Sequence, residues 1–451
     1  MAPPKIEIKL TRRDFLKAAA VASMFAALDW DRVINAFADA VRKGDIGIVW
    51  LEAQDCAGNT TSIIQATNPS LLDVLLGKTP LVGPGTVRLI FHETVMPEWG
   101  ATHVTSFSQT EQSSIYSTEE FYFGTAVEIL EEVAQGAYGS YVLVLEGSLP
   151  AEYGMTGTNI TTPGGFYCKI GPYTCTEWFK KLMKNAAAVV GIGNCASYGG
   201  IPANKVLEPP PFFQYPTNGW SQSPTGAIGL FDDPYRGITG VIHHPYFSDV
   251  IGPYSNYWDK DMVPDFETVK PIVAVPGCPA GPNGIMRTLA LLALATPAVG
   301  VIPASALQRS KFLDEYGRPL FIYQYTTHEQ CPRAAWYAAG DFRPYPGDND
   351  AKCLFAVGCK GPVAHCPWNK IGWVAGIGGP TRQGGVCIAC TNPGFTDAYE
   401  PFYVKLPYVG WSAKDLATAA TVVGAATVVA GAIAGGLYAA RQRAEKKEEK
   451  K

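Results

Sequence analysis

The last third of the chain contains a dense group of residues with soft metal-binding atoms. The group is one histidine and six cysteines: His328, Cys331, Cys353, Cys359, Cys366, Cys387 and Cys390. His328 lies three residues before Cys331, and the last two cysteines are spaced Cys-x-x-Cys, so each pair can bind one metal centre. Seven ligands are too many for a single zinc ion. Thiolates with an occasional histidine are the ligands of iron–sulfur clusters, and the simplest division is four ligands for one cluster and three for another.

Three cysteines further upstream each follow a short apolar segment that predicts a buried strand. They are Cys56 after residues 46–51, Cys195 after residues 188–193 and Cys278 after residues 272–277. In an open parallel sheet, ligands bind outside the carboxyl ends of the strands, so three cysteines that are far apart in sequence can converge there. The sequence therefore predicts a third cluster site at one edge of a sheet.

The elements around these cysteines predict an α/β fold. Residues 87–92 and 141–146 predict two more strands, and residues 118–135 and 174–187 predict amphipathic helices between strands. Further along the chain, glycine and proline recur at short intervals, as in residues 376–380, and periodic elements become scarce. We expect two domains: a flavodoxin-like domain with a parallel sheet over residues 41–310 and an irregular iron–sulfur domain over residues 311–411.

The N-terminal segment has the pattern of an export signal. Arg12 and Arg13 precede the mildly apolar run 18–28, which resembles a twin-arginine signal and predicts a signal peptide over residues 1–40. The sequence Ala38-Asp39-Ala40 is a plausible cleavage site. Twin-arginine export moves folded proteins, as a chain that receives its clusters before crossing the membrane requires.

The C-terminal segment predicts a membrane anchor. Residues 416–440 are uncharged and rich in alanine, glycine and valine, which is long enough for a helix to span a bilayer. We therefore expect a transmembrane helix over residues 412–440. The basic tail 441–451 follows, and under the positive-inside rule it stays cytoplasmic, leaving the globular part on the outer face.

Composition agrees with this picture and excludes one class of partner. The 451 residues, 47% of them hydrophobic, are enough for two or three domains with a packed core. The 47 glycines and 35 prolines fit a loop-rich half that wraps cofactors. A net charge of −4, with no basic stripe outside the two ends, argues against nucleic-acid binding.

Simpler interpretations of these residues exist. The cysteines of an exported protein could form disulfides, but the odd count of 11, the Cys-x-x-Cys spacing and the folded-export signal argue against this. Cys168 and Cys175 could be plain buried thiols. His328 is set apart from ordinary histidines by its place before Cys331. The other histidines have no such partner and are taken as ordinary polar residues: His92, His103, His243, His244 and His365.

Taken in order, four parts of the chain resemble the small subunit of membrane-bound nickel–iron hydrogenases. They are residues 50–56, 193–200 and 276–279 and the array from His328 to Cys390. The ordered set is specific although its single pieces are not, and the resemblance covers roughly residues 44–440.

The resemblance implies three clusters. A proximal four-iron cluster would be held by Cys56, Cys195 and Cys278, a distal four-iron cluster by His328, Cys331, Cys353 and Cys359, and a medial three-iron cluster by Cys366, Cys387 and Cys390. No further cysteine lies between Cys366 and Cys387, which favours three irons at the medial site.

The proximal motif departs from the family. The usual Cys-x-x-Cys is here Cys56-Ala57-Gly58-Asn59, and a neutral carboxamide is a poor substitute for a thiolate. The fourth proximal ligand is therefore open among the Asn59 oxygen, Asp55, Cys168, Cys175 and solvent. The segment between Cys195 and Cys278 is also longer than the family norm, and its prolines and many aromatics predict an ordered surface loop.

The function that the resemblance implies is electron transfer in a membrane-bound uptake hydrogenase. The chain lacks paired Cys-x-x-Cys motifs of the kind that bind nickel–iron, so H2 would be oxidised on a separate large subunit. Electrons would then pass the proximal, medial and distal clusters to a membrane cytochrome b or similar quinone-linked partner. Glu52 is taken as a structural carboxylate, although the resemblance leaves a role in a proton path open.

Two alternative functions remain. One is an iron–sulfur subunit of a quinone reductase, which lacks the second half with seven ligands. The other is a subunit of a hydrogen-sensing complex, which has no reason for export or a membrane anchor.

Overall fold

The computed structural model describes the central part of the chain. The described residues are 33, 46–67, 70–71, 88–96, 101–104, 121–123, 125–151, 167–205, 223, 225–260, 269–296, 307–344 and 351–404. Apart from Val33, the predicted signal peptide, transmembrane helix and basic tail lie outside these ranges. Within the ranges, we find no helix that has both the length and the apolar character needed to cross a bilayer.

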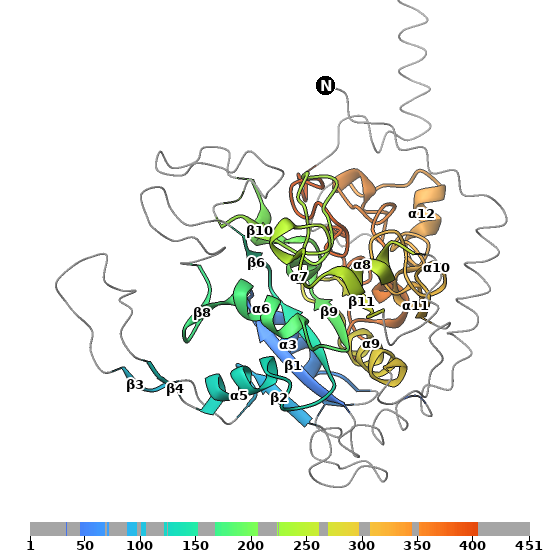
Figure 1. The fold of residues 1–451 in the computed structure, drawn as a ribbon. Coiled ribbons are helices and arrows are strands. Elements are labelled where there is room, and N and C mark those ends of the chain that lie inside the picture. Colours follow the sequence, from blue (N-terminus) through green and yellow to red (C-terminus); the bar gives the residue numbers. More distant parts are fainter. Residues whose placement is uncertain are drawn as a thin grey trace, which may run out of the picture.

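A five-stranded parallel sheet forms the centre of the first half (Figure 1). Its strands are β1 (Gly47–Glu52), β2 (Arg88–His92), β5 (Tyr141–Glu146), β9 (Ala188–Ile192) and β11 (Ile272–Val275). They lie in the order β2-β1-β5-β9-β11, and every neighbouring pair is parallel. This is the doubly wound order of flavodoxin-like sheets, and all five predicted strands are confirmed.

The central strands read as continuous apolar runs because the sheet is covered on both faces. Every residue of β5, β9 and β11 is buried. Helices α3 (Gly58–Ile64) and α9 (Pro282–Ala295) pack together on one face, and α5 (Thr125–Ala134) and α6 (Cys175–Met183) pack together on the other (Figure 1). The carboxyl ends of the strands therefore remain the accessible edge for a site.

The helix predicted over residues 118–135 is wrong at its N-terminal end. Phe121–Phe123 form the short strand β4, which pairs with β3 (Ala101–Val104), and α5 begins only at Thr125. Three consecutive aromatic residues favour a strand over a helix, which explains the difference. The helix predicted over residues 174–187 is confirmed as α6, which begins with a capping box between Thr174 and Glu177.

Residues 225–260, described within the insertion between Cys195 and Cys278, do not form the predicted surface loop. Its aromatic residues Phe231, Phe247, Tyr254 and Tyr257 are buried in the main hydrophobic core. Burial of so much aromatic surface stabilises the segment against the first domain. Its elements are β10 (Ala227–Ile228), which pairs with β6 (Leu149–Pro150), the 3-10 helix η3 (Pro245–Phe247) and α8 (Gly252–Trp258).

The C-terminal half, described over residues 307–344 and 351–404, has the irregular structure that the sequence predicts. The α-helices in these ranges are four or five residues long: α10 (Arg309–Phe312), α11 (Leu320–Tyr323), α12 (Ala334–Ala338) and α13 (Trp368–Ile371). A second, smaller hydrophobic cluster around Leu354, Val357 and Phe395 forms its centre. In Figure 1 this half, in orange and red, lies beside α7 (Asn194–Tyr198) and the carboxyl end of β9.

Candidate metal centres

The three upstream cysteines lie together at the carboxyl edge of the sheet. Cys56 follows β1, Cys195 lies in the first turn of α7 after β9, and Cys278 follows β11. Burial raises the pKa of Cys195 to about 12, and the neighbouring Cys278 and Cys56 thiols contribute to that rise. Cys56 and Cys278 are exposed, so this group opens onto the surface of the chain.

Two of the candidates for the fourth proximal ligand are excluded by the structure. Cys168 and Cys175 form a disulfide, which corrects both their assignment as possible ligands and the alternative that they are plain thiols. The reason is local: β7 (Lys169–Ile170) and β8 (Tyr173–Thr174) form a small hairpin that places its flanking cysteines opposite each other. Two cysteines flanking a Gly-Pro turn were the sequence signal for this pairing. The remaining cysteines are all free.

Asn59 lies between the loop that contains Cys195 and the loop that contains Cys278. Its side chain is buried, and its Oδ1 accepts a hydrogen bond of 2.9 Å from the backbone N–H of Ala280. Gly193, at φ 88°, lies so close that a Cβ there would meet the Asn59 amide. Asn59 therefore contacts the loops that lead to Cys195 and Cys278.

The Asp55 side chain lies in a group of carboxylates and not among the proximal cysteines. Its carboxylate accepts a hydrogen bond of 2.6 Å from Ala57 N–H, and it lies with Glu52 and Glu146 so that one oxygen of each is within 4.8 Å of the others. Partial burial raises the pKa of Asp55, and the nearby Glu52 raises it further. Asp55 thus belongs to a carboxylate cluster beside the proximal cysteines.

Glu146 is a site residue that the sequence analysis missed. It ends β5, the strand between those that lead to Cys56 and Cys195, and it is fully buried. Its carboxylate accepts from Trp50 Nε1 at 2.9 Å, from Asn59 N–H at 2.8 Å and from the Thr60 hydroxyl at 2.6 Å. A carboxylate closing an otherwise apolar strand was the signal that could have identified it.

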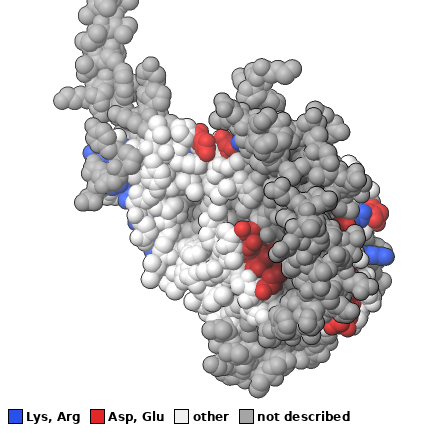
Figure 2. Space-filling model, turned by 90° about the vertical axis from the view of Figure 1, so that its left-hand side faces the viewer, with Lys and Arg blue, Asp and Glu red and all other residues white. Residues whose placement is uncertain are grey.

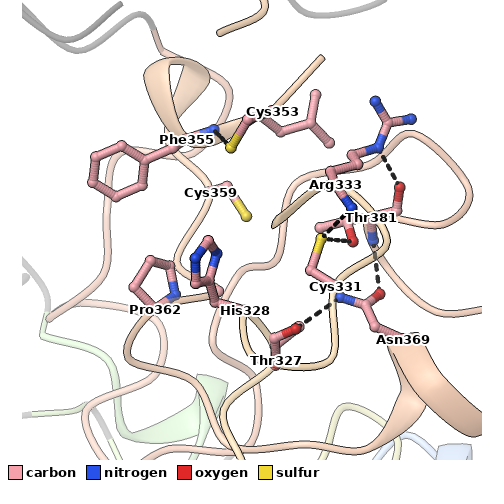
Figure 3. A pocket seen from close by; sticks show the side chains of 12 residues that line it. Thr327, His328, Cys331, Arg333, Cys353, Phe355, Cys359, Pro362, Asn369 and Thr381 are labelled. Carbon is pink, nitrogen blue, oxygen red and sulfur yellow. Dashed lines mark hydrogen bonds between the residues drawn. The ribbon is translucent and has the colours of Figure 1, made fainter. Parts of the chain in front are cut away.

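The four predicted distal ligands surround one pocket (Figure 3). His328, Cys331, Cys353 and Cys359 all line it, and Figure 3 shows their ring and sulfur atoms facing the same space. The lining comes from irregular loops, which place side chains that no single helix or strand could bring together.

The distal sulfur atoms already accept hydrogen bonds. Backbone N–H groups of Arg333, Phe355 and Cys387 donate, each at 3.4 Å, to Cys331, Cys353 and Cys359 respectively. The Thr381 hydroxyl also lies 2.9 Å from Cys331 Sγ. Such donors stabilise thiolate charge and tune cluster potential, so the pocket fits an iron–sulfur cluster with three sulfur ligands and one imidazole.

The predicted medial cysteines form a third, more deeply buried group. Burial raises the pKa of Cys366, Cys387 and Cys390 to about 12 each, and neighbouring thiols within the group contribute to all three rises. The Thr327 hydroxyl donates to Cys366 Sγ at 3.5 Å. Thiols with such pKa values stay protonated on their own, so a metal would have to displace their protons on binding.

The three groups form a row. The N–H of the medial Cys387 donates to the sulfur of the distal Cys359 at 3.4 Å, and Asn194, next to the proximal Cys195, donates to the carbonyl of the medial Cys390 at 3.0 Å. The medial cysteines therefore contact both of the other groups.

In Figure 2, acidic side chains of the described residues gather near the centre of the face, while the lysines and arginines lie toward its margins, several of them along the left edge.

Comparison with known proteins gives matches to both halves. The family model for the C-terminal part of the NiFe/NiFeSe hydrogenase small subunit matches residues 323–403, and the model for the NADH ubiquinone oxidoreductase 20 Kd subunit matches residues 56–292.

Similar proteins extend over most of the chain. The F420 non-reducing hydrogenase I small subunit of Methanosarcina mazei is 30% identical, with 94% of this chain and 92% of that protein covered. The quinone-reactive Ni/Fe-hydrogenase small chain of Wolinella succinogenes is 26% identical, with 87% and 83% covered. A chain of the actinobacterial-type NiFe-hydrogenase from Ralstonia eutropha superposes with a TM-score of 0.52 at 30% identity, with 80% of this chain and 83% of that chain covered.

Proposed function

Because this chain belongs to the small-subunit family of nickel–iron hydrogenases, we propose that it relays electrons in a membrane-bound uptake hydrogenase. Small subunits of this family are electron-transfer components, and the active site lies on the large subunit. The electrons would come from H2 oxidation there and leave to a membrane cytochrome b or similar quinone-linked partner. The observation that carries this proposal is the row of three cysteine groups.

The proposed cofactors are two four-iron clusters and one three-iron cluster. The proximal site would use Cys56, Cys195 and Cys278, with the fourth position left to Asn59, Asp55 or solvent. The distal site would use His328, Cys331, Cys353 and Cys359, and the medial site Cys366, Cys387 and Cys390. Bound clusters would supply one-electron oxidation and reduction, and the chain would set their order and surroundings.

Exposure of the cysteine groups supports a direction through the chain. The proximal group has two exposed cysteines, as expected for a face that docks on the large subunit. The medial group is the most buried of the three. At the far end His328 is partly exposed, which suits an exit to the next partner.

The main alternative is a quinone-reductase subunit. The match over residues 56–292 fits that class as well, because it covers the proximal cysteines and the sheet strands β2, β5, β9 and β11 but none of the seven later ligands. The match over residues 323–403 and the seven ligands within it favour the hydrogenase. A hydrogen sensor is disfavoured by the twin-arginine pattern and the apolar C-terminal segment.

Export and membrane attachment are part of the proposal. The signal pattern in residues 1–40 supports export by the twin-arginine route, and residues 412–440 support a single anchor with the globular part outside the cytoplasm. A relative named as quinone-reactive supports a quinone-linked acceptor.

Metal analysis tests the cofactor set. The chain, purified anaerobically with its large subunit, is expected to hold about eleven iron atoms beyond those of the nickel–iron site, from two four-iron clusters and one three-iron cluster. Iron near four per chain, or stoichiometric zinc, would refute the three-cluster assignment. Co-purification of a nickel-containing large subunit would identify the catalytic partner directly.

A further inference from the structure

Asn194 connects the proximal and medial cysteine groups. It directly precedes Cys195 and is only 1% exposed. Its Nδ2 donates to the backbone carbonyl of Cys390 at 3.0 Å and to that of Asn392 at 2.8 Å. One side chain on the proximal helix α7 therefore holds the loop that carries a medial cysteine.

Only the nitrogen of the Asn194 side-chain amide forms hydrogen bonds within the described residues. Within the described part of the chain, its Oδ1 is buried and has no hydrogen-bond partner. A buried acceptor without a partner is unfavourable, so an apolar residue of similar size would remove that cost. The donor bonds to the medial loop are what asparagine specifically supplies at this position.

Cys390 is attached to the proximal site through its carbonyl. The donor is Asn194 Nδ2, on the residue next to the proximal cysteine Cys195. The second bond of the same nitrogen, to the carbonyl of Asn392, holds the loop two residues further on.

The medial and distal groups are joined by a similar pair of contacts. The N–H of Cys387 donates to the sulfur of Cys359 at 3.4 Å, and the carbonyl of Cys387 accepts from Lys360 N–H at 2.8 Å. Here both contacts involve main-chain N–H groups. The proximal–medial junction differs in that both of its contacts come from a side chain, that of Asn194.

We infer that Asn194 is a positioning residue of the electron relay, which holds the Cys390 loop against the start of α7 beside Cys195 and so fixes the contact between the proximal and medial sites. The inference rests on the proposed function, because it requires clusters at both sites. Electron transfer slows steeply as the gap between donor and acceptor widens. Residues that orient metal ligands from behind commonly change function without binding the metal themselves.

The test compares two asparagine variants in the intact large–small complex. Asn194→Leu removes both donor bonds and the unpaired oxygen with little change in volume. Asn185→Leu is the matched control, because Asn185 Nδ2 also donates to a backbone carbonyl, that of Ala134 at 2.8 Å, on the far side of the sheet from the cysteines. Iron content, the spectrum and potential of the medial cluster, and its rate of reduction after rapid mixing with H2 are measured.

We expect Asn194→Leu to keep its iron, to show an altered medial-cluster spectrum or potential, and to slow medial reduction roughly tenfold or more, while Asn185→Leu matches the unchanged complex. A fully loaded Asn194→Leu complex with normal spectrum and rate would overturn the inference alone. Absence of a medial cluster from the unchanged complex would overturn the proposed function as well.

A second variant covers the case in which Asn194→Leu loses iron. Asn194→Ser keeps one donor and should slow medial reduction less. A normal rate in that variant would equally overturn the inference.

Discussion

Asn59 lies where the proposed proximal site departs from the motif that the family resemblance implies. It occupies the position of a second cysteine in the usual motif, and its amide contacts the loops leading to Cys195 and Cys278. With Cys168 and Cys175 joined in a disulfide, the protein groups left as fourth ligand are oxygen donors. A neutral oxygen donates less charge to iron than a thiolate does.

Replacing Asn59 by cysteine tests this directly. If the fourth ligand is an oxygen, Asn59→Cys should lower the potential of the proximal cluster, because a charged thiolate stabilises its oxidised form. The loss of the bond to Ala280 should also destabilise the chain by about 1 kcal/mol. Redox titration followed by electron paramagnetic resonance measures the potential.

The control adds a thiol away from the site. Asn283 in α9 also accepts a backbone hydrogen bond through its side-chain oxygen, from Thr67 N–H at 3.0 Å, so Asn283→Cys should leave the potential unchanged. An unshifted potential in Asn59→Cys would mean that the fourth ligand lies elsewhere.

At the scale of elements, the β7–β8 hairpin and its disulfide are a structural crosslink that contains none of the remaining candidate cluster ligands. The hairpin precedes α6, and Cys175 is fully buried at the first turn of that helix. The bond therefore fixes where α6 begins and how it packs on the sheet.

Removing the disulfide should affect stability and spare the clusters. The double variant Cys168→Ser/Cys175→Ser is expected to lose about 2–3 kcal/mol of stability, as for a short closed loop. Iron content and all cluster potentials should match the unchanged protein. Thermal unfolding and metal analysis check both points, with the unsubstituted protein in its disulfide-bonded form as the reference. Loss of the proximal signal would instead assign one of these cysteines to the cluster.

The 3-10 helix η3, within the inserted segment, has a pH-sensitive N-terminal cap. His244 caps it by accepting from Tyr246 N–H through Nδ1, and burial lowers the pKa of His244 to about 4. The folded protein therefore favours the neutral His244 ring. The contribution of this ring to the free energy of unfolding is fully present above its pKa in the unfolded chain, near 6.5, and is lost as the pH falls toward 4.

His244→Asn should reduce the loss of stability in acid. Asparagine keeps an N-cap acceptor but does not titrate. Between pH 7 and pH 5, His244 is expected to account for about 2 kcal/mol of the loss, since one pKa unit corresponds to 1.36 kcal/mol. The melting temperature of the complex at the two pH values checks this, and His92, whose pKa burial also lowers to about 4, remains in both proteins. An equal drop in the two proteins would contradict the assignment.

The elements show which parts of the structure follow from local sequence. The five sheet strands were predictable because parallel strands buried on both faces are continuous apolar runs. The strand at Phe121–Phe123 was missed because its pairing with Ala101–Val104 is not visible in a helical period. The burial of the insertion was missed for a similar reason: its aromatic residues gain their contacts only from the folded sheet.

At the scale of the whole molecule, the row of cysteine groups depends on contacts that span the chain. The family resemblance implied which cysteines belong to each site, while the residues alone predicted only a division of the last seven ligands into four and three. The sequence could not predict two hydrogen bonds: the one that Asn194 donates to the Cys390 carbonyl and the one that Asn59 N–H donates to the Glu146 carboxylate. Each joins residues that are far apart in sequence and meet only at the edge of the folded sheet. Packing of the irregular half against α7 therefore decides how closely the groups approach.

The proposed anchor can be separated from the relay by truncation. Stopping the chain after Ser412 removes residues 413–451 and none of the predicted cluster ligands, the last of which is Cys390. Hydrogen oxidation with an artificial dye should therefore persist, while quinone-linked activity should fall because the complex no longer stays beside its acceptor.

The matched control is a chain that stops after Ala440, which keeps the apolar segment and loses only the basic tail. Activity with both acceptors and the distribution between membrane and soluble fractions after a carbonate wash are the measurements. If the chain ending at Ser412 stays in the washed membranes and reduces quinone normally, residues 413–440 are not the anchor, and another subunit must hold the complex at the membrane.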